Sequence, residues 1–94
     1  MLRLPLVVIF RMPNALENPR LGITIKAKTN SVYRNKIKRG IREFFRKNKK
    51  PLGAYDYNFV VSTRKKVDHL FVSELLRLIN EEFLNAKNRF KPSR

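Results

Sequence analysis

The chain has 94 residues, with 22 Lys and Arg against 7 Asp and Glu, so its formal net charge is +15. That length supports one domain with a modest core and is too short for two. The 43% hydrophobic content excludes a wholly disordered chain, and the charge indicates a polyanionic partner, for which nucleic acid fits better than an anionic membrane. Cys is absent, which excludes disulfides and thiolate metal sites and suits a reducing cytoplasm. His69 is the single histidine, which argues against a zinc site or a His-based catalytic dyad.

The first apolar run, residues 4–10, predicts a β-strand rather than a membrane helix. It is far shorter than the roughly 20 residues that a membrane helix needs, and Arg3 and Arg11 bracket it. β-branched and aromatic residues dominate residues 6–11, and Met-Pro-Asn at 12–14 interrupts the pattern. We therefore expect a strand over residues 6–11, followed by a connection of the hairpin type over residues 14–19.

Two later segments alternate apolar and polar side chains with the period of a half-buried strand. In residues 21–26, Leu and Ile alternate with Gly, Thr and Lys, and in residues 55–62 the side chains of Tyr57, Phe59 and Val61 share one face. Both segments are expected to be strands. Pro51 and Gly53 mark the end of the helix that precedes the second segment, and residues 63–67 are expected to form a basic loop.

A basic amphipathic helix is expected from residue 32 to residue 46 or 48, after N-cap candidates at residues 29–31. At roughly 100° per residue, an apolar stripe spans about 120°; it comprises Tyr33, Ile37, Ile41, Phe44 and Phe45. The next arc of about 140° is basic or amide-bearing; it holds Arg34, Asn35, Lys38, Arg39, Arg42 and Arg46. The lone acid, Glu43, lies at the far edge of that arc. A helix that needed only solubility would mix both signs of charge, so this arc predicts a surface that binds a polyanion.

A second helix is expected from residue 68 or 71 to about residue 87, because its apolar residues follow the i, i+3, i+4, i+7 rule. They are Val72, Leu75, Leu76, Ile79 and Phe83. Residues 88–94 are expected to be a frayed basic tail. The order strand, strand, helix, strand, helix predicts an α+β fold, a small sandwich of a mixed β-sheet with helices packed on one face. We expect the chain to form a single RNA-binding domain over residues 1–94.

Three motifs in this order resemble the protein subunit of bacterial ribonuclease P. They are RLGITI at residues 20–25, RNKIKRGIREFFR at residues 34–46 and DYNFVVSTR at residues 56–64. That family carries an Arg-Leu/Val-Gly strand, a signature of the form RNxxKRxxRExxR, and a D-[YV]-[VI]-x-[VI] strand before a final amphipathic helix. The similarity extends over about residues 6–83, nearly the whole chain.

The resemblance implies a left-handed βαβ crossover and a subunit that binds the catalytic RNA and assists endonucleolytic removal of 5′ leaders from precursor tRNA. The RNA is then expected to perform the chemistry, with Mg²⁺ at the RNA and RNA–substrate interface and with no catalytic residue in the protein. The signature and the basic arc together assign RNA contacts to Arg34, Asn35, Lys36, Lys38, Arg39, Arg42 and Arg46. Further RNA contacts are considered at Lys26, Lys28, Arg64, Lys65 and Lys66.

The sequence departs from the family pattern at its start. Members normally carry a phenylalanine-bearing helix that flanks a cleft over the sheet, where the single-stranded leader lies. This sequence starts almost directly in the first strand, as a truncated sequence or a reduced variant would, and Val8 takes a position often given to a cleft tyrosine. How the leader is bound without that helix stays open.

An alternative function is a non-enzymatic structural RNA binder, such as a small ribosomal protein, since charge and size fit both. The order of strand, signature and strand favours ribonuclease P. The spacing of Phe44, Phe45, Tyr57 and Phe59 is typical of core residues rather than of stacking platforms for bases. Glu74, Glu81 and Glu82 fit a solvated helix face better than acid–base catalysis.

Overall fold

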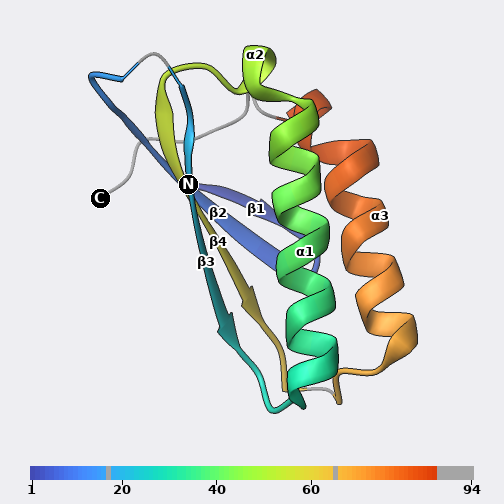
Figure 1. The fold of residues 1–94 in the computed structure, drawn as a ribbon. Helices are drawn as coiled ribbons and strands as arrows, with labels where there is room; N and C mark the ends of the chain where they lie inside the picture. The colour runs from blue at the N-terminus through green and yellow to red at the C-terminus, as the bar shows by residue number, and fades with distance from the viewer. Residues whose placement is uncertain (17, 65, 87–94) are drawn as a thin grey trace.

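Four strands and three helices succeed one another in the computed structural model, which describes residues 1–16, 18–64 and 66–86. The strands are β1 (Leu2–Leu4), β2 (Val7–Pro13), β3 (Arg20–Lys26) and β4 (Tyr55–Ser62). The helices are α1 (Ser31–Lys47), α2 (Lys49–Leu52) and α3 (His69–Ala86). One sheet is covered on one face by α1 and α3 (Figure 1), so the predicted α+β sandwich is confirmed.

The strand order is β1-β2-β4-β3, and the sheet is mixed. β2 pairs antiparallel with both β1 and β4, whereas β3 pairs parallel with β4. The expected hairpin across residues 14–19 is therefore wrong, because β4 lies between β2 and β3. The hairpin of this sheet joins β1 to β2 instead, through a tight turn in which Leu6 adopts a φ of 72°.

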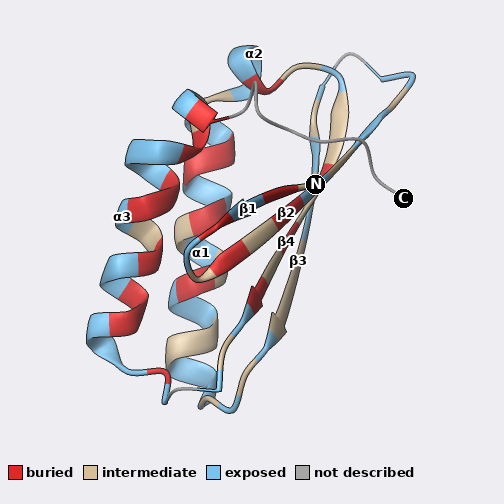
Figure 2. Cartoon of the chain, turned by 180° about the vertical axis from the view of Figure 1, so that it is seen from behind, coloured by how far each residue is buried: buried red, intermediate tan, exposed pale blue. Residues whose placement is uncertain are grey.

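The unit β3-α1-β4 is a left-handed crossover. In Figure 1 the chain descends through β3 on the near side of the sheet, rises through α1 on the helical side, and descends through β4 behind β3. The reversed view in Figure 2 agrees, since β1 and β2 are then nearest the viewer. Parallel units of this kind are nearly always right-handed, so the hand implied by the family resemblance is the uncommon one, and it is confirmed.

The core lies between the sheet and the two long helices, as the buried inner sides of α1 and α3 show in Figure 2. The predicted stripe of α1 faces it: Ile37, Ile41, Phe44 and Phe45 are buried, and Tyr33 is half-buried. The aromatic rings of α1, β4 and α3 meet edge to face, with the Phe59 centroid 5.4 Å from that of Phe83 and 5.9 Å from that of Phe45. These rings are core residues, as their spacing predicts.

The helix boundaries agree closely with the expected ones. Asn30 is the N-cap of α1, and its side-chain oxygen accepts a hydrogen bond from the backbone N–H of Tyr33 at 2.9 Å. α3 begins at His69, after Asp68 accepts the backbone N–H of Phe71 at 2.9 Å. The expectation of a frayed tail over 88–94 falls outside the described residues.

A polar clamp ties the connection between β2 and β3 to the sheet. Arg20 donates to both carboxylate oxygens of Asp56, at 2.8 and 2.6 Å, and the Asn14 side-chain amide donates to the same carboxylate at 2.9 Å. These hydrogen bonds, first from Arg20 and then from Asn14, lower the pKa of Asp56 to about 2. The start of β3 is thereby fixed beside the start of its parallel partner β4.

Asp56→Asn should remove a pH-dependent part of the stability. The folded pKa of about 2 lies below the ordinary value of 3.8, so the ionised carboxylate stabilises the fold above about pH 4, and this contribution is lost as the pH falls toward 2. In thermal unfolding followed by circular dichroism, we expect the wild-type Tm to exceed that of the variant near neutral pH and the difference to shrink in acid. A difference that stays constant down to about pH 2 would contradict the clamp.

At Gly40 of α1, the side chain of Leu76 from α3 packs directly against the helix backbone. A Cβ atom on residue 40 would lie 2.6 Å from Cδ1 of Leu76, far inside van der Waals contact. Glycine costs up to about 1 kcal/mol relative to alanine in a helix. The close packing of Leu76 against α1 therefore explains why residue 40 is glycine despite this cost.

Gly40→Ala and Leu76→Ala should therefore be coupled. In the wild-type background, Gly40→Ala should change the free energy of unfolding by less than about 1 kcal/mol, because better helix propensity is offset by displacement of Leu76. In a Leu76→Ala background the clash is absent, and Gly40→Ala should stabilise by about 1 kcal/mol. Equal effects in both backgrounds, measured by urea unfolding, would show that the two positions do not touch.

Candidate nucleic-acid interface

The outward side of α1 carries the predicted basic arc. The exposed members of the arc and the signature are Asn35, Lys36, Arg39, Arg42 and Arg46. Arg34 and Lys38 are half-buried, one turn apart. Because the opposite stripe is held in the core, the rotation of the helix is fixed, and these side chains can face only solvent or a partner.

A shallow pocket of about 290 Å³ lies on this side of α1. It is lined by Asn35, Arg39, Arg42, Glu43 and Arg46. In this pocket three guanidinium groups and an amide surround one carboxylate. Guanidinium groups suit phosphate oxygens, because they offer planar pairs of N–H donors and remain charged.

Charge is distributed unequally between the two long helices. α1 contains seven Lys and Arg residues and one acid, Glu43, whereas α3 contains three Glu residues and one Arg, Arg77. On α3, Arg77 contacts both Glu74 and Glu81, so its charge is balanced locally. A polyanion is therefore attracted more strongly to α1 than to α3.

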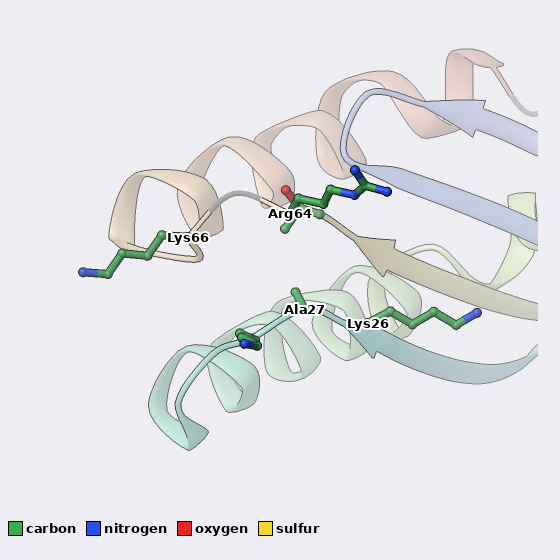
Figure 3. Close-up of a pocket in the computed structure, with 6 residues that line it drawn as sticks. Lys26, Ala27, Arg64 and Lys66 are labelled. Atoms are coloured by element: carbon green, nitrogen blue, oxygen red, sulfur yellow. The ribbon is translucent and has the colours of Figure 1, made fainter.

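A second basic site lies where the parallel strands β3 and β4 end. A pocket of about 700 Å³ there is lined by Lys26, Ala27, Lys28, Thr63, Arg64 and Lys66. Figure 3 shows Lys26 and Arg64 extending toward the same side, back along the sheet, while Lys66 points the opposite way. The structure thus brings four of the predicted additional contacts to one pocket, Lys26, Lys28, Arg64 and Lys66, with Lys66 directed away from Lys26 and Arg64; Lys65 lies outside the described residues.

The face of the sheet opposite the helices exposes two apolar side chains that the sequence did not point to, Phe10 and Met12, beside Val8. Phe10 and Met12 are 39% and 68% exposed, and Val8 lies between Arg3 and Val60 in the strand register. A small pocket of about 200 Å³ is lined by Arg3, Leu4, Leu6, Val7, Val8, Val60 and Ser62. The signal in the sequence is that both alternating faces of residues 7–10 are apolar, so one of them must lie outside the core.

Most carboxylates of the described residues contact neighbouring groups and are not gathered at one place. Asp56 contacts Arg20, Glu43 contacts Arg46, and Asp68 caps α3. Over residues 1–16, 18–64 and 66–86, no three His, Cys, Asp or Glu side chains are placed to hold a metal ion together. His69, at the first residue of α3, is exposed.

In the part of the chain that the structure describes, every helix is too short or too polar to cross a membrane.

Comparison with known proteins identifies the family. The family model described as Ribonuclease P matches residues 2–87. The ribonuclease P protein component of Thermotoga maritima is 40% identical over 86 residues, which cover 90% of this chain and 72% of that protein. The corresponding component of Azotobacter vinelandii is 44% identical over 71 residues, covering 73% and 53%.

A solved structure agrees with the sequence comparison. The RNase P protein from Thermotoga maritima, in complex with 1-(4-fluorophenyl)-2-thiourea, superposes with a TM-score of 0.71 at 28% identity, covering 96% of this chain and 84% of that one. The alternative of a small ribosomal protein is not favoured by these matches. The chain therefore belongs to the ribonuclease P protein family, whose members are protein components of a tRNA-processing ribonucleoprotein.

Proposed function

We propose that α1 is the surface through which this chain binds the RNA of ribonuclease P, and that the bound protein assists removal of 5′ leaders from precursor tRNA. The observation that carries this proposal is the one-sided charge of α1, with seven cations and one acid on a helix whose rotation the core fixes. Lys and Arg side chains that neutralise phosphates release counterions, which drives association. The proposed contacts are Arg34, Asn35, Lys36, Lys38, Arg39, Arg42 and Arg46.

Two other surfaces would serve the precursor tRNA. The pocket at the ends of β3 and β4 offers Lys26 and Arg64 to phosphates, and the open face of the sheet offers Phe10 and Met12 to unstacked bases. Stacking of a base on an aromatic side chain contributes roughly 1–3 kcal/mol. Single-stranded leader RNA, which combines phosphates with unpaired bases, suits both surfaces.

The chemistry is proposed to belong to the RNA. Most of the carboxylates that could act as bases or Mg²⁺ ligands are held by arginines or by a helix N-terminus, as in the pairs Asp56–Arg20 and Glu43–Arg46. Mg²⁺ prefers several oxygen ligands in octahedral geometry, and the described residues do not provide such a set. We therefore propose that RNA phosphates, rather than this protein's side chains, bind the Mg²⁺.

The direct test is reconstitution. Purified protein is added to a bacterial ribonuclease P RNA at low Mg²⁺, and cleavage of the 5′ leader of a precursor tRNA is followed. We expect the protein to restore cleavage that the RNA alone performs poorly, because it neutralises phosphates that Mg²⁺ would otherwise screen. Failure to stimulate cleavage, together with retention on ribosomal subunits rather than on this RNA, would favour the structural RNA binder instead.

Substitutions on the two sides of α1 should separate RNA binding from stability. Arg39→Ala and Arg42→Ala should each weaken RNA association by roughly 1–3 kcal/mol, lower the slope of log affinity against log salt by about one, and leave Tm nearly unchanged. Ile41→Ala should instead cost about 2–5 kcal/mol of folding free energy, because Ile41 is fully buried. Binding assays over a salt series and thermal unfolding measure both effects. If the arginine variants bind like wild type, α1 is not the RNA surface.

A further inference from the structure

The single acid of α1 lies inside the proposed RNA surface. Glu43 lines the 290 Å³ pocket together with Arg39, Arg42 and Arg46. A carboxylate at this place repels RNA phosphates, so by charge alone it weakens the function of the surface.

Glu43 holds Arg46 by two contacts. Arg46 donates from Nε to Oε2 of Glu43 at 3.3 Å and from Nη2 to Oε1, while Nζ of Lys47 lies 3.8 Å from the same Oε1. The hydrogen bonds from Arg46 lower the pKa of Glu43, so the carboxylate is ionised at neutral pH. Both partners remain accessible, with side-chain exposures of 65% for Arg46 and 48% for Glu43.

The remaining donors of Arg46 are what a phosphate needs. A guanidinium group has five N–H donors, and Glu43 takes one at Nε and one at Nη2. One hydrogen of Nη1 and one of Nη2 stay available on the other edge of the group, which is the arrangement for bidentate recognition of an oxyanion, and the second hydrogen of Nη1 points back toward Cδ.

A matched pair on α3 shows a different arrangement. Arg77 contacts Glu74 in the same i, i+3 geometry, with Nε at 3.2 Å from Oε2, but its Nη1 also contacts Glu81 Oε2 at 3.1 Å. Both edges of Arg77 are therefore occupied by carboxylates of the helix itself. Within the residues that the structure describes, no second carboxylate contacts Nη1 of Arg46.

We propose that Glu43 is a positioning residue for RNA binding: it holds Arg46 by two hydrogen bonds so that the open guanidinium edge in the α1 pocket receives an RNA phosphate. This inference rests on the proposed function, since it requires that α1 contacts RNA. An unheld arginine at a helix surface samples many rotamers, and ordering it on binding weakens the complex.

Two effects of removing Glu43 then have opposite signs. Loss of the carboxylate removes a repulsion from phosphate, which in a high dielectric is worth up to about threefold in affinity. Loss of the hydrogen bonds frees Arg46, and the entropy of fixing it again on binding should weaken affinity about 3- to 10-fold. The sign of the net change therefore decides between the two roles.

The experiment measures dissociation constants for ribonuclease P RNA at fixed salt. Glu43→Gln and Glu43→Ala are each made in the wild-type chain and in an Arg46→Ala chain, and Glu74→Gln, which breaks the matched pair on α3, is the control. Thermal unfolding accompanies each variant. Because exposed pairs of this kind add little stability, Tm should stay within a few degrees of wild type.

The expected result is weaker binding for both Glu43 variants in the wild-type chain, with the larger loss for Ala, and unchanged or tighter binding in the Arg46→Ala chain. Glu74→Gln should bind within about twofold of wild type. Tighter binding for the Glu43 variants in both chains, or an equal loss in both, would overturn the positioning role. Arg39→Ala, measured in parallel, separates this failure from that of the proposed function: if it too leaves affinity unchanged, α1 does not contact RNA at all.

Discussion

The burial of one face of the sheet under two helices is the constraint on which the rest of this structure depends. A chain with a net charge of +15 cannot place its cations inside, so its stability must come from a dense apolar layer. That layer is built around Phe59, which contacts Phe45 of α1 and Phe83 of α3 edge to face. Because the same layer fixes the rotation of α1, it also decides which side chains face outward. Stability and the orientation of the basic arc thus follow from one interaction.

The parallel pairing of β3 with β4 gives the interface its second part. Parallel strands end at the same edge of a sheet, so the segments that follow them meet there although they are far apart in the sequence. Lys26 ends β3 and Arg64 follows β4, and the pocket between these two segments is basic for that reason. The clamp of Asp56 with Arg20 and Asn14 fixes the other end of the same pair of strands. An antiparallel pairing of β3 and β4 would have separated the basic segments.

The helices and the central strand could be predicted from the sequence because their periodicity is long and their buried faces are complete. The stripe of α1 and the alternation of Tyr57, Phe59 and Val61 are of this kind. The strand order could not be predicted, since alternation shows which face is buried but not which strand is the neighbour. β1 has three residues and α2 has four, too few for any period to appear. The contacts of Glu43 were equally hidden, because a helical wheel places an acid on a face without showing which donors it holds.

The acidic side chains are distributed unequally between the two long helices, so the positive charge of the molecule is concentrated on one side. On α3, carboxylates occupy both edges of the guanidinium of Arg77, which makes that side neutral to acidic. On α1, one carboxylate holds one edge of Arg46, and the pocket keeps an excess of positive charge. Seven cations and one acid on α1, against one Arg and three Glu on α3, concentrate positive charge on the α1 side, which favours the approach of RNA to that side before any specific contact forms. The same type of ion pair can therefore neutralise an arginine on one helix and prepare it for a phosphate on the other, and the difference lies in whether a second carboxylate stands one turn away.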